Sequence, residues 1–114
     1  MAQPDGVKVM LNLHTDSGYG SHIGYYWWNQ GHSRMLGLKA TQAMSRFYGP
    51  DTSIRNWDYS GYKFVTLTKH ACTPLLIEAG SHQNDHDIAV VNDMGYLVAR
   101  SIINATLDYF SAYL

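Results

Sequence analysis

Two residues that could do chemistry stand where apolar, strand-like runs end. Glu78, the chain's only glutamate, follows the run Pro74–Ile77 and precedes Ala79-Gly80, and His14 follows the run Val7–Leu13. In open α/β sheets, ligands bind at the rim where strands end, so both side chains could converge there. Histidine is the commonest metal ligand, and a carboxylate beside a metal-bound water can act as a general base. The plainer alternatives are a solvated glutamate and a hydrogen-bonded structural histidine.

The remaining candidate residues give weaker signals. His82 and His86 are four apart and could form a metal pair on one helix face, but the polar residues around Asn84 favour a turn. Several others lack a partner at a diagnostic spacing or the context of a catalytic nucleophile: His22, His32, His70, Ser17, Ser21, Ser81 and Cys72. The glycines from Gly18 to Gly24 do not match a phosphate-binding fingerprint.

Composition narrows the class of protein. A chain of 114 residues fits one domain, 1–114, with a modest core. A net charge of -1 and a pI near 6.6 give no electrostatic reason to expect nucleic acid or anionic membrane as a partner. The single Cys72 excludes an internal disulfide, and no run approaches the roughly 18 apolar residues of a membrane span. We expect a soluble chain without an export signal at its first residues.

The elements that must position His14 and Glu78 follow from periodicity. We predict strands over 7–13, 23–28 and 62–67, with the central strand beginning at Pro74. The aromatic run Tyr25–Trp28 favours an edge or rim strand, and 51–60 is predicted to be irregular.

Two helices complete the predicted order. Ser33 is a candidate N-cap for a helix stopped by Gly49-Pro50, and Asp93 for a last helix that follows a short helical turn near 88–91. The expected apolar helix faces are Leu36, Ala40, Ala43, Met44 and Phe47, and then Met94, Leu97, Val98, Ile102, Ala105 and Tyr109.

This order of strand, strand, helix, strand, strand, helix predicts an α/β domain with a mixed sheet flanked by helices. Two helices are few for covering both faces of a buried sheet. We therefore expect the chain to be part of a larger domain that is incomplete at its N-terminus.

The two strand ends carry a resemblance. Val9-Met-Leu-Asn-Leu-His14-Thr-Asp and Pro74-Leu-Leu-Ile-Glu78-Ala-Gly80-Ser-His-Gln-Asn84-Asp-His-Asp87 resemble motifs of the zinc-dependent N-acetylmuramoyl-L-alanine amidases of the type 3 family. Those enzymes have a strand ending in Ser-Leu-His-Ala-Asn and a later Pro-x-x-Leu-Val-Glu-x-Gly-Phe-x-x-Asn-x-x-Asp segment. The resemblance covers essentially the whole chain but only the C-terminal portion of the family's catalytic domain, a phosphorylase/hydrolase-like amidase fold.

The resemblance implies a function in peptidoglycan hydrolysis. His14 matches the last zinc ligand and Glu78 the catalytic glutamate, with Zn²⁺ as cofactor. The substrate would be peptidoglycan or a muropeptide, cut at the amide between N-acetylmuramic acid and L-alanine. The protein would act at the bacterial cell wall, either secreted or held in the cytoplasm until phage-mediated lysis, as a phage endolysin is. Asn84 and Asp87 are expected to fix the turn after the strand.

The chain also departs from the family pattern. The family's two earlier zinc ligands, a histidine and a glutamate, have no counterpart among the thirteen residues before His14. Ser81 replaces an aromatic, and Thr15-Asp16 replaces Ala-Asn. We therefore expect this chain alone to be inactive or poorly active, with a missing N-terminal segment or a second chain completing the zinc site. Two alternatives remain: a non-catalytic module that binds cell wall or a partner through Tyr25–Trp28 and the Gly18–Gly24 loop, and a zinc carboxypeptidase-type hydrolase.

Overall fold

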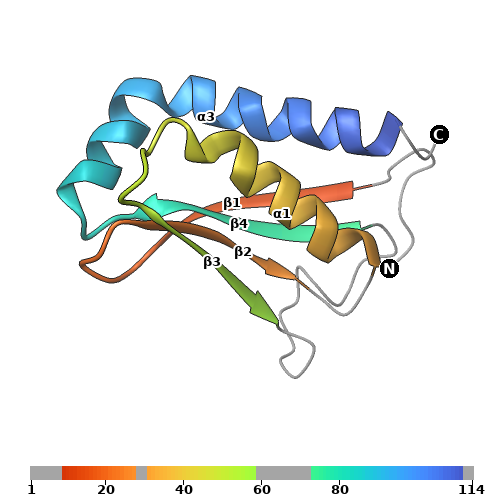
Figure 1. The fold of residues 1–114 in the computed structure, drawn as a ribbon, viewed down its shortest axis with the longest axis horizontal. Helices are drawn as coiled ribbons and strands as arrows, with labels where there is room; N and C mark the ends of the chain where they lie inside the picture. Colours follow the sequence, from red (N-terminus) through yellow and green to blue (C-terminus); the bar gives the residue numbers. More distant parts are fainter. Residues whose placement is uncertain (1–8, 28–30, 59–72, 112–114) are drawn as a thin grey trace.

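The protein is an α/β domain with a four-stranded mixed sheet and two helices, in the order ββαββα (Figure 1). The computed structural model describes residues 9–27, 31–58 and 73–111. The strands are β1 (Val9–Asp16), β2 (His22–Trp27), β3 (Ser53–Asp58) and β4 (Thr73–Ser81). The helices are α1 (Gly31–Ser45) and α3 (Asp85–Ser111). The α/β class is therefore as predicted, but the third strand of this order is Ser53–Asp58 and not the predicted 62–67.

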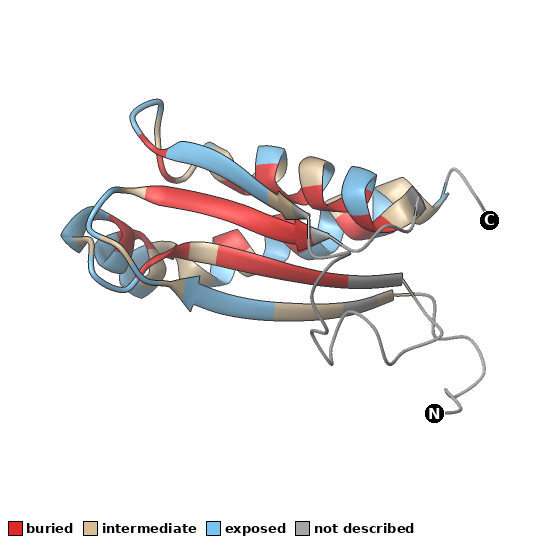
Figure 2. Ribbon diagram, turned by 90° about the horizontal axis from the view of Figure 1, so that it is seen from below, coloured by how far each residue is buried: buried red, intermediate tan, exposed pale blue. Residues whose placement is uncertain are grey.

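The sheet has the strand order β1-β4-β2-β3, which places β4 beside β1. β1 runs parallel to β4, β2 runs antiparallel to β4, and β3 runs parallel to β2. The ends of β1 and β4 therefore meet at one rim, as the sequence predicts. In Figure 2 the buried strands are the two central ones, β4 and β2, whereas β1 and β3 are more exposed.

Both helices pack on the same face of the sheet, where the core lies (Figure 1). Strand side chains alternate, so Ile23 and Tyr25 of β2 and Leu75 and Ile77 of β4 all face α1 and α3. The helices contribute buried side chains at helical spacing: Leu36, Ala40 and Met44 from α1, and Val90, Val98 and Ile102 from α3. The predicted core position Leu97 is wrong, since its side chain is 45% exposed.

Close approach of α1 to β2 requires a glycine. A Cβ atom on Gly37 would clash with the ring of Tyr25, because it would lie 2.6 Å from Cγ of Tyr25. Gly37 therefore allows the helix to lie directly on the aromatic ring, which explains why Tyr25 is 4% exposed.

Several predicted boundaries are corrected by the structure. α1 begins at Gly31, so Ser33 is a buried residue inside the helix and not its N-cap. β2 lies between β4 and β3 and is not an edge strand, because its aromatic residues alternate between the two faces and both faces can bury them. The predicted strand over 62–67 lies outside the described residues.

Residues 53–58 form β3, although 51–60 was predicted to be irregular. The backbone is ordered by its parallel pairing with β2, from His22 opposite Ser53 to Trp27 opposite Asp58. Polar side chains such as Arg55 and Asn56 are compatible with a strand here, because β3 is an edge strand and both are exposed.

α3 is one continuous 27-residue helix, and the predicted break before Asp93 is wrong. Its N-cap is Asn84, whose side-chain oxygen accepts a hydrogen bond of 3.0 Å from the backbone N–H of Asp87. Asp93 is exposed within the helix and caps nothing. No helix in the described ranges is long and apolar enough to span a membrane.

Candidate functional site

His14 and Glu78 lie side by side on the sheet. Their Cα atoms are register partners in the parallel pair β1–β4, and Glu78 is also opposite Gly24 across the antiparallel pair β4–β2. Paired residues point to the same face of a sheet. The two side chains therefore share the face opposite α1 and α3, one row before the strand ends.

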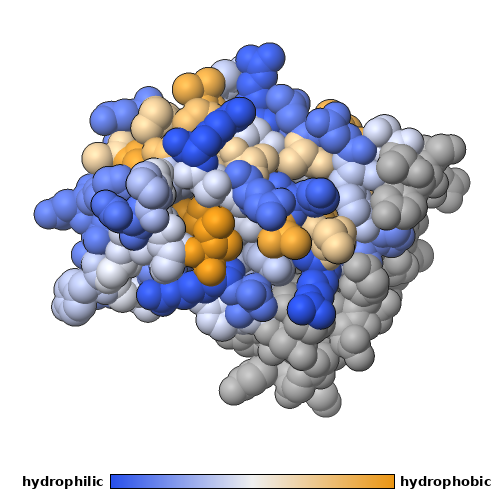
Figure 3. All heavy atoms as spheres, viewed as in Figure 1, coloured by the Kyte–Doolittle hydropathy of each residue, from blue (hydrophilic) through white to orange (hydrophobic). Residues whose placement is uncertain are grey.

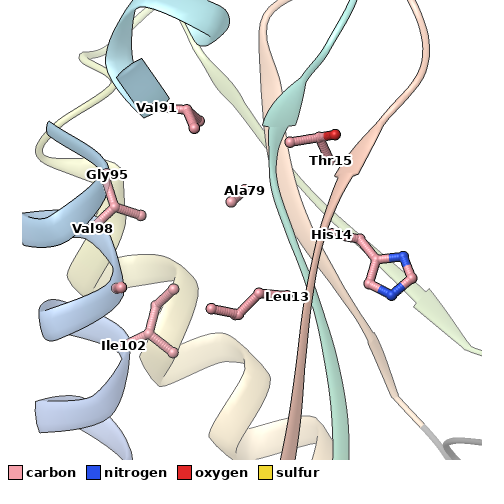
Figure 4. A pocket seen from close by; sticks show the side chains of 9 residues that line it. Leu13, His14, Thr15, Ala79, Val91, Gly95, Val98 and Ile102 are labelled. Carbon is pink, nitrogen blue, oxygen red and sulfur yellow. The ribbon is translucent and has the colours of Figure 1, made fainter. Parts of the chain in front are cut away.

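A hollow of about 370 Å³ lies on the other side of β1, against α3. Its lining is mainly apolar and includes Leu13, Ala79, Val91, Val98 and Ile102. Figure 4 shows Leu13 and Ile102 at this hollow, while the ring of His14 points away from it. The hollow is therefore separate from the chemistry of His14 and Glu78.

Glu78 is a buried carboxyl group in the middle of the sheet. Its side chain is 5% exposed, and Oε2 has no hydrogen-bond partner among the described residues. Burial, together with the negative charge of Asp16, raises the pKa of Glu78 to about 7, although the charge of His22 opposes the shift. Such a group exchanges a proton near neutral pH.

Asn12 is a second polar group on this face, two residues before His14. Its side-chain nitrogen Nδ2 is buried and, within the described part of the chain, makes no hydrogen bond. Asn12 is the register partner of Leu76, which lies two residues before Glu78 in β4. Asn12, Leu76 and Glu78 therefore point to the same face of the sheet. A buried donor and a buried acceptor thus lie near each other, each with unused hydrogen-bonding capacity.

Asp16 and His22 form an ion pair at the rim, which sequence reasoning missed. His22 Nε2 lies 2.8 Å from Asp16 Oδ2, and His22 Nδ1 lies 2.8 Å from the carbonyl oxygen of Gly20. Both partners are acceptors, so both contacts form together when both ring nitrogens carry a proton. The chain reverses direction between β1 and β2 through a loop that contains Gly18 and Gly20. This short glycine-containing loop is the sequence signal that could have suggested contact between Asp16 and His22.

Asp87 holds this rim together from the first turn of α3. Its carboxylate accepts hydrogen bonds from Ser21 Oγ at 2.6 Å, from the backbone N–H of His22 at 3.0 Å and from that of Ser81 at 2.9 Å. Burial raises its pKa, but these donors and His86 outweigh burial and lower it. The expectation that Asn84 and Asp87 fix the turn after the strand is confirmed by these contacts.

Gly80 is required where β4 turns toward α3. Its φ is +94°, and a Cβ atom would lie 3.0 Å from Cβ of Asp87 and 3.2 Å from Cε1 of Tyr48. The Tyr48 hydroxyl donates a 3.0 Å hydrogen bond to the carbonyl oxygen of Ala79, which fixes the residue after Glu78. The glycine two residues after Glu78 therefore has a structural cause.

The other histidines that the structure describes are not assembled into a metal site. His82 lies in the turn after β4 and contacts Thr15, while His86 lies in α3 and contacts Asp87, so they do not form a pair on one helix. His32 contacts the hydroxyl of Tyr109. His70 and Cys72 lie outside the described residues. Across residues 9–27, 31–58 and 73–111, no group of three or more histidine, cysteine or acidic side chains could hold a metal ion.

Comparison with known proteins adds no family assignment. The sequence matches no protein-family model, and no curated protein matches it.

Proposed function

We propose that this chain carries part of the site of a peptidoglycan amidase, which hydrolyses the amide between N-acetylmuramic acid and L-alanine. The observation that carries the proposal is Glu78. It is a buried carboxyl group whose Oε2 has no hydrogen-bond partner among the described residues, and it is the register partner of His14 near the rim of a mixed sheet. This arrangement agrees with the roles that the motif resemblance assigns to both residues.

Glu78 is suited to move protons in amide hydrolysis. With a pKa of about 7, it can take a proton from an attacking water and release that proton again near neutral pH. The proton then passes to the nitrogen of the leaving alanine as the carbon–nitrogen bond breaks. One residue can therefore serve as base in the first half of the reaction and as acid in the second.

The described residues do not by themselves fit a catalytic zinc. Such a site takes three protein ligands and keeps one position for water. His14 is one candidate ligand, and it makes no hydrogen bond within the described ranges, but no set of three is present there. The proposal therefore assigns His14 as one ligand and requires the others from outside the described residues or from a second chain.

The test uses the protein at its natural length, with its metal content and intact mass measured first. Release of L-alanine from N-acetylmuramoyl-L-alanine is then compared between the natural protein and its Glu78→Gln variant. We expect one zinc per chain and a loss of at least 100-fold in rate, the size typical of a missing general base. Asp93→Asn, an exposed change on α3, is the matched control and should retain full rate. Equal rates for Glu78→Gln and the natural protein would refute the catalytic role.

A non-catalytic wall-binding module is the second candidate. It is favoured by the stacked pair Tyr26–Trp57 on the face of Glu78, with ring centroids 4.4 Å apart, and by the lack of a three-ligand set in the described ranges. Trp27 and Trp28, which the sequence suggested for this role, have no described side chains. Under this candidate, Glu78→Gln leaves wall binding intact and there is no hydrolysis for it to abolish.

A further inference from the structure

β3 carries two side chains on the same face as Glu78, in a strand that the sequence did not predict. The row across the sheet is His14, Glu78, Gly24 and Arg55, because each is the register partner of the next. Trp57 follows two residues after Arg55 and therefore points to the same face. Arg55 lies two strand spacings, roughly 10 Å, from Glu78.

The ring of Trp57 lies over Gly24, the residue of β2 that pairs with Glu78. A Cβ atom on Gly24 would lie 2.6 Å from Cζ3 and 3.0 Å from Cη2 of Trp57, so the indole occupies the space that a side chain at 24 would fill. Its ring is held in place by stacking on Tyr26 at an interplanar angle of 18°. Trp57 is nevertheless partly exposed, so part of the indole remains available for contact.

Arg55 supplies a positive charge at the same rim. Its guanidinium reaches back toward the β1–β2 loop, since Nη2 lies 3.9 Å from where a Cβ atom of Gly20 would be. Arg55 is exposed and forms no ion pair or hydrogen bond among the described residues. A guanidinium with unused donors binds a carboxylate through two parallel hydrogen bonds.

We propose that Trp57 and Arg55 form the recognition half of the Glu78 site, for a ligand that joins a sugar ring to a short acidic peptide. The indole packs against the sugar ring, and the guanidinium binds a carboxylate of the peptide part. Glu78, whose Oε2 has no hydrogen-bond partner among the described residues, lies beside Gly24 and the Trp57 indole in this row and faces the amide. This assignment rests on the proposed function for the identity of the ligand, and it goes beyond that function by naming which residues of this chain select it.

The test measures binding of N-acetylmuramoyl-L-alanyl-D-isoglutamine, which has one free carboxylate, and of its uncharged C-terminal amide, by isothermal titration calorimetry. We expect the protein to prefer the acid by about tenfold, the size of one charge-assisted contact. Arg55→Gln should abolish this preference and leave binding of the amide unchanged. Trp57→Ala should weaken both ligands by a similar factor, and Trp57→Phe should restore part of the loss. Arg100→Gln, an exposed change on α3, is the matched control.

The outcomes separate this inference from the proposed function. A preference for the acid that survives in Arg55→Gln, or no binding of either ligand by the unmodified protein, overturns the assignment of Arg55. Arg55-dependent binding without any release of alanine supports the recognition site while contradicting the hydrolase. Glu78-dependent hydrolysis, together with a preference for the acid that Arg55→Gln leaves unchanged, supports the hydrolase and contradicts the recognition site.

Discussion

Two buried carboxyl groups, Glu78 of β4 and Asp87 in the first turn of α3, differ in whether their surroundings stabilise a negative charge. Asp87 is 1% exposed and accepts hydrogen bonds from two other segments of the chain, Ser21–His22 and Ser81, so its pKa is lowered despite burial. Glu78 is 5% exposed, has an oxygen without a partner in the described residues, and its pKa is raised to about 7. Burial alone therefore does not set the role of an acid, because the donors around it decide whether the charge is kept.

The comparison assigns the two groups different tasks. Asp87 is a structural group, since its charge ties β2, β4 and α3 together. Glu78 gains little from being charged in the folded protein and is free to exchange a proton with a ligand or a water. Substitutions at the two carboxyl groups and at the residues around them test this difference.

The largest effect is expected from Asp87→Ala. This change leaves the buried N–H groups of His22 and Ser81 without an acceptor, and we expect a loss of roughly 3–5 kcal/mol in the free energy of unfolding. Urea denaturation measures it, with Asp93→Ala as an exposed control on the same helix. The carboxylate's contribution is present above the unfolded pKa and is lost as pH falls through the lowered folded value. A loss below 1 kcal/mol would show that Asp87 does not hold the rim.

Gly80→Ala tests the backbone that connects the two groups. The change combines a positive φ with a Cβ contact to Asp87 at 3.0 Å, so we expect a loss of about 2–3 kcal/mol. Gly49→Ala is the matched control, because φ is +89° there but no atom lies within 4 Å of the added Cβ. Gly49→Ala should cost only about 1 kcal/mol, and equal losses at both positions would mean that contact with Asp87 is unimportant.

Glu78→Gln is expected to change how stability depends on pH. A carboxyl group whose folded pKa is raised stabilises the fold while it is protonated, and this contribution is lost as pH rises from about 4.5, the unfolded value, through about 7. The unmodified protein should lose on the order of 3 kcal/mol over that range relative to Glu78→Gln. Urea titrations at pH 4.5 and 8 measure this difference, and parallel pH profiles of the two proteins would contradict it.

Tyr48→Phe gives the smallest expected effect. The Tyr48 hydroxyl donates to the carbonyl oxygen of Ala79, so its removal should cost about 1 kcal/mol. Burial and the nearby Asp87 charge raise the pKa of Tyr48 to about 12, so this donor stays protonated throughout the pH range of the other tests. Tyr96→Phe, at a side chain that is 75% exposed, should leave stability unchanged. If Tyr96→Phe lowered the free energy of unfolding more than Tyr48→Phe, the hydrogen bond from Tyr48 to Ala79 would not be the stabilising contact.

Periodicity was enough to predict the α/β class, the positions of β1, β2 and α1 within a few residues, and the central position of β4. It predicted that strands end at His14 and Glu78; the two residues are register partners, but β1 continues to Asp16 and β4 to Ser81. Leu36, Ala40 and Met44 are buried as their helical spacing indicates. These features depend on local patterns of apolar residues, which the sequence displays directly.

The rest depends on contacts between distant segments. β3 was missed because an exposed edge strand such as 53–58 needs no alternation of apolar residues, and only its pairing with β2 orders it. The Asp16–His22 pair depends on how the glycine-containing loop turns, and the single helix α3 depends on capping by Asn84, so neither follows from spacing alone.

On the face with α1 and α3, hydrophobic side chains lie among hydrophilic ones (Figure 3). The exposed apolar residues of the two helices include Met35 of α1 and Leu97, Ile103 and Leu107 of α3. The expectation that the chain belongs to a larger domain stays a prediction.

The most direct test of the central claim is the pKa of Glu78 itself. Because Glu78 is the only glutamate in the chain, labelling with ¹³C-glutamate gives a single side-chain carboxyl signal from that residue. Its NMR titration should have a midpoint near 7, as expected for a buried carboxyl group beside the negative charge of Asp16. A midpoint near the ordinary 4.5 would mean that Glu78 is charged and well solvated at neutral pH, and the role proposed for it as a proton carrier would be wrong.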